Sequence, residues 1–372
     1  MKVIIAKDEL TKGLQMCVSA VAQKTTLPLL SNFLFETEGN KIKLSATDLE
    51  VGIMCYLKAE IIEEGSVTIP AKKFADIIKE LPNTDIEIKA DKTNQINIKV
   101  AKSKFVLMGL ATDDYPKMPQ ADTENGLQIN TKTFSDMLKK TIFAVSKDQQ
   151  RYVLNGVYVC LENGKMEVVA TDGKRLAYIS DNYENTQITG QAIIPTKAAN
   201  EIIKLLTFNP AIETATIYFG QTNIVVQVAD VTLVTNLIEG KFPNYKQILP
   251  STELNTVKLN VPETTAAVKQ VALFTIPDSI SNKVAAIKFM FDKNTMKVLA
   301  NTSTIGSGEY ETNIEFDKPK FSVLVNPVFA IDVLKNITDE NMLFSYTTSN
   351  APVFISPTNN KNYICVIMPI RE

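Results

Sequence analysis

The sequence contains no histidine. This absence excludes Ser-His-Asp and Cys-His catalytic relays, histidine-ligated metal sites and the HExxH motif of zinc proteases. The phosphate-binding signatures GxxxxGKS/T and GxGxxG after a strand are also missing. An enzyme built from this chain would therefore depend on carboxylate, lysine, tyrosine or serine chemistry.

Cysteine is scarce, with four residues in a chain of 372. None of them forms a CxxC pair, so we expect no disulfide framework, no zinc site and no cofactor. Each lies in an apolar pattern. We interpret Cys17, Cys55, Cys160 and Cys365 as buried, reduced thiols of a cytoplasmic protein.

Long apolar runs and an excess of one charge are missing as well. No run approaches the length of about 18 residues that spans a membrane, and too few apolar residues precede Lys7 for a secretory signal. The 39 basic and 41 acidic residues give a net charge of −2, and no long run of like charges forms a tail. We therefore expect neither a membrane segment nor a charged interaction tail.

What the sequence does contain is a repeat. Three segments alternate apolar and polar residues around a central Gly/Asn turn, which is typical of a hairpin of two strands. They read NFLFETEGNKIKLSATD (32–48), NGVYVCLENGKMEVVATD (155–172) and AAIKFMFDKNTMKVLANT (285–302).

A strand, a proline and an amphipathic helix follow each hairpin at a nearly constant distance. These segments read VTIPAKKFADIIKEL (67–81), AIIPTKAANEIIKLL (192–206) and VLVNPVFAIDVLKNI (323–337). Equivalent hairpin residues, at positions 46, 170 and 300, are 124 and 130 residues apart. Equivalent strand residues, at positions 69, 194 and 325, are 125 and 131 residues apart. So long a period indicates triplication of a domain rather than a solenoid.

We therefore predict an α+β protein of three repeated domains, each with two helices and antiparallel strands. The domains are placed at residues 1–122, 127–250 and 254–372, with linkers near 119–126 and 250–255. The predicted helices are 8–24, 71–81, 131–147, 196–206, 262–274 and 326–337.

These predicted helices carry 13 basic and 8 acidic residues, although the chain as a whole is slightly acidic. Solvated helix faces rich in lysine would explain the excess, and so would a helix surface that faces a polyanion. The small net charge speaks against a strongly basic DNA-binding patch. A weak, salt-sensitive contact with phosphates is compatible with it.

Several motifs resemble one family, the bacterial DNA polymerase III beta subunits or DNA sliding clamps, along the whole chain. They are TLPLLSNFLFE (26–36), RYVLNGV (151–157), ATDGKRLA (170–177), LIEGKFPNYKQILP (237–250) and VIMPIRE (366–372). The resemblance implies a head-to-tail homodimer, a ring of six domains and twelve helices that encloses duplex DNA. It also implies an accessory subunit without catalysis, which tethers the DNA polymerase III alpha subunit, the clamp loader and other proteins with a clamp-binding motif.

The resemblance implies a groove that receives a partner peptide with a hydrophobic end. Without the resemblance, the apolar residues that line this groove would be interpreted as ordinary core residues. Two positions depart from the family pattern, since Lys174 stands where histidine is frequent and Gln247 where a basic residue is usual. The expected lining is Leu154, Thr171, Gly173, Lys174, Arg175, Leu176, Pro243, Ile248, Pro352, Val366, Met368, Pro369, Ile370 and Arg371.

The resemblance to the family also implies DNA contacts and a subunit interface. The alternatives are solvated surface lysines for the first set and core residues within a domain for the second. The expected DNA contacts are Lys24, Lys72, Lys73, Lys147, Gln149, Arg151, Tyr152 and Lys197. At the interface, Phe105 and Leu107 on a strand edge would oppose Leu273 and Phe274 of a second copy.

Two other functions remain open at this stage. A carboxylate enzyme could use Asp48 and Asp172, which occupy matching turns, although Thr302 stands at the third position and these carboxylates are better interpreted as caps of local amides. A peptide-binding scaffold unrelated to DNA is the other alternative.

Overall fold

The computed structural model describes residues 1–22, 24–118, 125–183, 187–251, 253–275, 285–303 and 305–371. Residues 119–124 of the first expected linker lie outside the described residues, as do residue 252 of the second and the domain limits placed at 122 and 372. The chain divides into two compact units, Met1–Ser135 with Ile188–Leu237 and Asp136–Gln187 with Ile238–Glu372. Within the described ranges, no helix is both long and apolar enough to cross a membrane.

The first unit contains antiparallel sheets built from the predicted hairpins. Its strands are β1 Lys2–Ala6, β2 Asn32–Glu38, β3 Lys41–Thr47, β4 Val51–Lys58, β5 Glu60–Glu63, β6 Ser66–Pro70, β7 Asp85–Ala90, β8 Gln95–Val100, β9 Ser103–Met108, β10 Leu127–Asn130, β14 Gly190–Pro195, β15 Thr214–Phe219, β16 Asn223–Val228 and β17 Val231–Asn236. One sheet has the order β5-β1-β7-β8-β9, and a larger one has the order β10-β15-β16-β17-β4-β3-β2-β6. Pairing of β17 with β4 makes the larger sheet continuous across two repeats.

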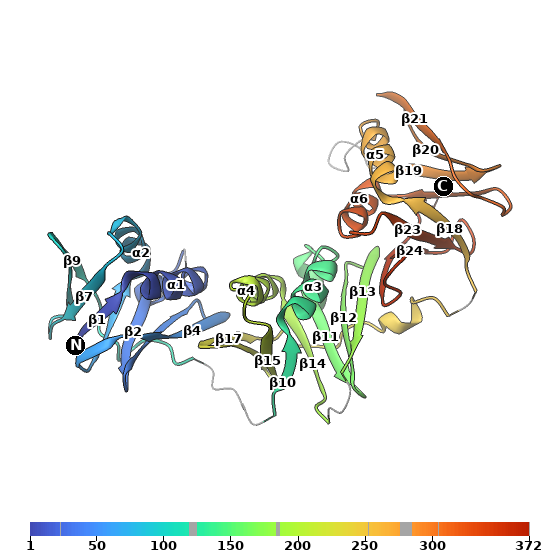
Figure 1. The fold of residues 1–372 in the computed structure, drawn as a ribbon. Coiled ribbons are helices and arrows are strands. Elements are labelled where there is room, and N and C mark those ends of the chain that lie inside the picture. Colours follow the sequence, from blue (N-terminus) through green and yellow to red (C-terminus); the bar gives the residue numbers. More distant parts are fainter. Residues whose placement is uncertain are drawn as a thin grey trace. The chain divides into compact units, whose positions relative to one another are not determined.

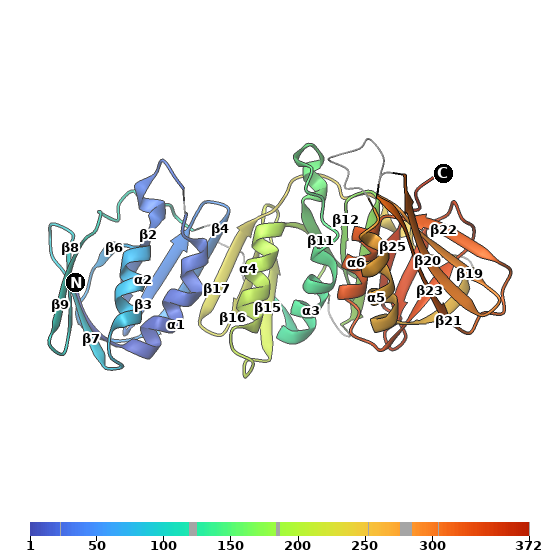
Figure 2. The same cartoon turned by 90° about the horizontal axis from the view of Figure 1, so that it is seen from above.

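Helices α1 Lys7–Cys17, α2 Ala71–Glu80 and α4 Thr196–Thr207 belong to this unit, and Figure 2 shows them lying across its strands. Each buries one apolar face, such as Phe74 and Ile78 of α2. The helix predicted over 8–24 is too long at its C-terminal end. The α-helix stops at Cys17, and after one 3-10 turn the Ala22 N–H donates to the Leu30 carbonyl at 3.0 Å instead of continuing the helix.

The second unit has the same construction (Figure 1). Its strands are β11 Gly156–Glu162, β12 Lys165–Thr171, β13 Arg175–Asn182, β18 Asn255–Asn260, β19 Ile287–Asp292, β20 Thr295–Thr302, β21 Gly306–Asn313, β22 Phe321–Val325, β23 Asn341–Tyr346, β24 Val353–Pro357 and β25 Tyr363–Ile367. One sheet runs β11-β12-β13-β25-β24-β23-β18, and the other has the order β21-β20-β19-β22. All three predicted hairpins, β2–β3, β11–β12 and β19–β20, are confirmed.

Helices α5 Val261–Ala272 and α6 Pro327–Lys335 pack against each other in the second unit. Helix α3 Thr131–Ile142 contributes its last residues to this unit and ends before the predicted position 147. There the Thr141 hydroxyl bonds back to the Met137 carbonyl at 2.9 Å, and the Ser146 N–H donates to the Leu154 carbonyl at 2.9 Å. The chain is thereby drawn into the short 3-10 segment Gln149–Leu154.

The predicted burial is confirmed for three of the four cysteines, all of which are free thiols in the structure. Cys17, Cys55 and Cys365 are buried, and Cys160 is half-buried. Burial raises the pKa of Cys55 and of Cys365 to about 12, because an apolar interior disfavours the thiolate. These thiols are therefore core side chains and not reactive groups.

Candidate functional site

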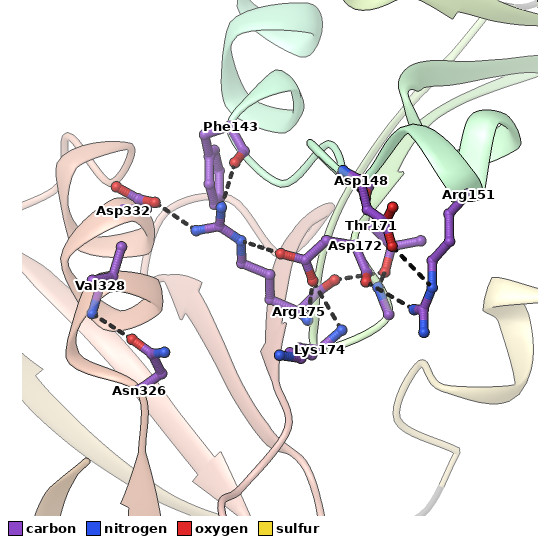
Figure 3. Close-up of polar contacts among 12 residues, drawn as sticks. Phe143, Asp148, Arg151, Thr171, Asp172, Lys174, Arg175, Asn326, Val328 and Asp332 are labelled. Atoms are coloured by element: carbon purple, nitrogen blue, oxygen red, sulfur yellow. Dashed lines mark hydrogen bonds and ion pairs between the residues drawn. The ribbon is translucent and has the colours of Figure 1, made fainter. Parts of the chain in front are cut away.

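The turn from Thr171 to Arg175 lies between β12 and β13 and is held by its own side chains (Figure 3). The Thr171 hydroxyl donates to the Arg175 carbonyl at 2.6 Å and accepts the Gly173 N–H at 3.0 Å. Oδ1 of Asp172 accepts the N–H groups of Lys174 and Arg175 at 2.9 and 3.0 Å. Gly173 has a φ of +85°, which a residue with a Cβ adopts at a cost.

The interpretation of Asp172 as a carboxylate that caps local amides is thereby confirmed. The same holds for Asp48, whose Oδ1 accepts the N–H groups of Glu50 and Val51 at 3.0 and 2.9 Å. Within the described part of the chain, no group of three Asp, Glu, Cys or His side chains is arranged to hold a metal ion.

Arg175 ties this turn to helix α6. Its Nε donates to Oδ2 of Asp172 at 3.1 Å, its Nη1 pairs with Asp332 at 2.5 Å, and its Nη2 donates to the Phe143 carbonyl at 2.9 Å. The guanidinium also lies over the ring of Phe329, 4.6 Å from its centroid. Arg175 is only 8% exposed, so the side chain that we expected in the groove lining is engaged beneath the turn.

The C-terminal segment runs directly beside this turn. Leu176 on β13 is the register partner of Val366 on β25, and both are buried. Beyond the strand, the Met368 N–H donates to the Lys174 carbonyl at 2.9 Å. The Met368 side chain is 41% exposed, so an apolar surface lies next to the exposed Lys174.

Two further backbone positions bring other expected residues to this region. The Ile370 N–H donates to the Leu324 carbonyl at 2.8 Å, which fixes the segment that carries Pro369 and Arg371. Val353 pairs with Ile367, so the half-buried Pro352 lies at the end of that strand pair.

The segment from Phe242 to Ile248 supplies the other apolar residues expected in the groove. The Phe242 ring stacks on Tyr158 at a centroid distance of 4.8 Å, and the Tyr245 hydroxyl donates to Oε2 of Glu167 at 2.6 Å. With Phe242 and Tyr245 buried, the side chains of Pro243 and Ile248 are left exposed.

Glu167 is the polar centre of the contacts that hold the Phe242–Ile248 segment on the sheet, and we call these contacts the anchor of the segment. Its carboxylate also accepts the Tyr178 hydroxyl at 2.8 Å and pairs with Lys165 and Lys246, each at 3.2 Å. Burial disfavours the charge, but the hydrogen bonds from Tyr245, Tyr178 and the two lysines outweigh it and lower the pKa of Glu167 to about 2. The carboxylate is therefore ionised at neutral pH and holds the segment on the sheet.

Leu154 is buried at the end of the 3-10 segment Gln149–Leu154. Arg151, from the same segment, aims Nη1 at the Asp172 carbonyl, 3.5 Å away, and its Nε lies 3.9 Å from Asp148. Arg151 was expected at DNA, yet its side chain adjoins the Thr171–Arg175 turn. Lys147, Gln149 and Tyr152 are exposed around it.

The other expected DNA contacts belong to the first unit. Lys72 and Lys73 are exposed in the first turn of α2, and Lys24 is exposed in the loop after α1 rather than on a helix. Lys197, in the first turn of α4, forms an ion pair with Asp48 and lies 3.8 Å from Glu50. Its charge is thus partly neutralised within the chain.

The residues expected at the subunit interface are exposed to different degrees within their units. Strand β9 is an edge of its sheet, with Phe105 and Leu107 half-buried and Val106 and Met108 more exposed. In the second unit Leu273 is 76% exposed. The ring of Phe274 packs closely on Gly308. A Cβ atom added to Gly308 would lie only 2.4 Å from that ring.

Sequence reasoning did not find Glu167, Tyr245 or Asp332. A hint was available for Glu167, because an acidic residue interrupts the apolar run of β12. No pattern pointed to Asp332, since a single acid on an amphipathic helix is usually solvated.

Comparison with known proteins then decides the family. The models for the N-terminal, central and C-terminal domains of the DNA polymerase III beta subunit match residues 1–119, 128–244 and 246–371. The chain belongs to this family. The beta sliding clamp of Chlamydia muridarum is 34% identical over 374 residues, which cover 100% of this chain and 99% of the relative.

Solved structures of the family agree. The beta subunit from Pseudomonas aeruginosa superposes with a TM-score of 0.94 at 29% identity and covers 100% of both chains. The one from Thermotoga maritima has a TM-score of 0.89 at 26% identity and covers 100% of this chain and 99% of its own. The predicted fold class, three repeated clamp domains, is confirmed. As a sliding clamp, the chain is an accessory processivity factor of DNA replication, and the carboxylate enzyme is not favoured.

Proposed function

We propose that two copies of this clamp close head to tail into a ring of six domains around duplex DNA. The observation that carries the proposal is the threefold repeat, which the three family domains match along the chain. Six similar domains present similar helices to the phosphates in every direction, and phosphate contacts position a protein without reading sequence. The net charge of −2 suits a ring that slides. We retain 1–122, 127–250 and 254–372 as the domain limits.

The subunit interface joins β9 of one copy to the third domain of the other. Support comes from the unpaired edge of β9, which carries Phe105, Val106 and Leu107, and from the exposed Leu273 beside Phe274. An apolar strand edge is a surface that pairs with another chain. Because the contact joins different surfaces, two copies form a closed ring when the rotation closes.

The partner groove is formed where the Thr171–Arg175 turn, the C-terminal segment and the Phe242–Ile248 segment expose their apolar residues. Met368 is adaptable, and together with Ile248 and Pro243 it suits the leucine or phenylalanine anchors of a short peptide. Arg175 and Leu176 support this surface from below. Lys174 gives the rim a positive charge. The occupants that we propose are the polymerase alpha subunit, the clamp loader and other proteins with a clamp-binding motif.

DNA retention tests the ring directly. Clamp assembled by a clamp loader on a nicked circular plasmid should stay bound during gel filtration and should be lost once the plasmid is linearised. Leu273→Asp should prevent retention on the circle, while Ile62→Asp, an exposed apolar position on β5, should not. Equal retention on circular and linear DNA would contradict enclosure and favour a patch that grips the duplex.

A further inference from the structure

A turn and a helix from neighbouring repeats are joined by an ion-pair clasp in the first unit. The Asp48 turn follows β3, and its carboxylate pairs with Lys197 on α4 of the next repeat. The Asp48 side chain is only 10% exposed, and its other oxygen holds the turn amides of Glu50 and Val51. The lysine is therefore bound to a carboxylate that is already fixed in place.

The second unit has a comparable clasp with different residues. There Arg175, at the end of the Asp172 turn, pairs with Asp332 on α6 of the following repeat (Figure 3). In both units the clasp joins the turn after the hairpin to the helix after the proline-containing segment.

The repeat spacing gives the equivalent positions at all three junctions. Two of these positions lie on the turn: the position of Asp48 and Asp172, and the position three residues after it. The other two lie on the helix: the position of Lys197 in its first turn, and the position four residues after it, where Asp332 stands. The equivalent sets are Asp48, Asp172 and Thr302; Val51, Arg175 and Ile305; Lys72, Lys197 and Val328; and Asp76, Glu201 and Asp332.

The third turn lacks both charges. Thr302 replaces the acid, and its hydroxyl donates to the Phe274 carbonyl at 2.5 Å. Ile305 replaces the arginine and is 51% exposed. Helix α2, in contrast, carries both helix partners, Lys72 and Asp76, and both are exposed. Neither side chain forms a hydrogen bond or an ion pair with another residue that the structure describes.

We propose that the junction between copies, which occurs twice in the ring, is built without a clasp. Lys72 and Asp76 of one copy face Thr302 and Ile305 of the partner subunit, where apolar contact replaces the ion pairs. This inference rests on the proposed head-to-tail ring. Because the junction between copies lacks these ion pairs, it should open more readily than the two junctions within each chain.

Restoring the missing half of the clasp tests the inference. Ile305→Arg should pair with Asp76 across the junction and lower the dimer dissociation constant by about fivefold, as a partly exposed ion pair allows. The control Ile305→Gln has a similar size and no charge. Sedimentation velocity over a dilution series at low salt gives the constants, and the gain should shrink at high salt.

The double variant Ile305→Arg with Asp76→Ala decides whether the pair forms. The inference holds if Asp76→Ala cancels the gain, and it is overturned if Ile305→Arg acts the same with and without Asp76 or leaves the dimer no tighter. If thermal melting shows that Ile305→Arg is misfolded, Thr302→Asp with and without Lys72→Ala decides by the same comparison. A wild-type protein that is monomeric at every concentration would instead refute the proposed ring.

Discussion

Single side chains in this clamp have roles that their neighbours in the sequence do not reveal. Arg175 lies beside Lys174, and both are cations in the motif that resembles the family. Lys174 is exposed at the surface, whereas the guanidinium of Arg175 is buried against Asp172, Asp332 and the ring of Phe329. A buried charge without its partner is costly, so these two adjacent positions should respond very differently to the same substitution.

Replacing Arg175 with methionine should lower the free energy of unfolding by about 3 kcal/mol, because Asp332 and Asp172 lose the cation between them. Urea denaturation measures the change. Lys174→Met removes the same charge one residue earlier and should alter stability by less than about 0.5 kcal/mol. Equal effects of the two substitutions would contradict the structural role of Arg175.

At the scale of elements, the groove depends on a short segment outside the sheets, Phe242–Ile248, which contains the 3-10 turn Tyr245–Gln247. Phe242–Ile248 is held on β11 and β12 by the stacking of Phe242 on Tyr158, by the hydrogen bond from Tyr245 to Glu167 and by the ion pair of Lys246 with Glu167. Gln247, which departs from the family pattern, lies on the exposed side of this segment. The presence of glutamine instead of a basic residue at this position should therefore alter partner affinity and leave the contacts of Phe242 and Tyr245 intact.

Glu167→Gln should destabilise the protein by about 2 kcal/mol, since hydrogen bonds to a charged acceptor are lost. It should also weaken a clamp-binding peptide several-fold by releasing Ile248. Fluorescence anisotropy with a labelled peptide measures the second effect. The control Glu162→Gln, at the exposed end of β11, should change neither quantity. Unaltered peptide affinity in a destabilised Glu167→Gln variant would show that the anchor serves stability alone.

The same carboxylate gives a pH dependence with a definite sign. Its pKa is lowered from 4.5 to about 2 in the folded protein, so the folded state binds fewer protons than the unfolded one in this range. The stabilisation by Glu167 is complete above pH 4.5 and disappears as the pH falls towards about 2. The stability difference between wild type and Glu167→Gln should therefore shrink over that window.

For the whole molecule, the proposed role depends on many weak contacts with DNA instead of one strong patch. Lys24, Lys72, Lys73 and Lys147 are exposed, whereas Lys197 and Arg151 are partly engaged with acidic side chains. Each phosphate contact releases counterions, so the number of contacts sets the salt dependence of binding.

Changing those four exposed lysines together to alanine should reduce the slope of log K against log salt, by up to about 0.9 for each phosphate that a lysine no longer neutralises. A salt titration of DNA association measures the slope. The control variant replaces four other exposed lysines, Lys92, Lys102, Lys318 and Lys361, and should keep the slope. A normal slope and normal loading in the first variant would reject these residues as DNA contacts.

The sequence alone determined the repeat, the α+β class, the three hairpins and the approximate helices, because strand alternation and helix amphipathicity are local patterns. It also indicated the family through short motifs. The ends of α1 and α3 could not be predicted, since they depend on hydrogen bonds to the loops that follow, such as Ala22 to Leu30 and Ser146 to Leu154.

Only the tertiary structure decided which charges are free and which are engaged. Arg175 and Asp332 are 157 residues apart, and Tyr245 and Glu167 are 78 apart, so no local pattern joins them. Likewise, Lys72 and Lys197 occupy equivalent helix positions, yet only Lys197 has a partner among the described residues. The reason is physical: an ion pair depends on the distance and burial that folding imposes on two side chains, which the identity of either residue does not fix.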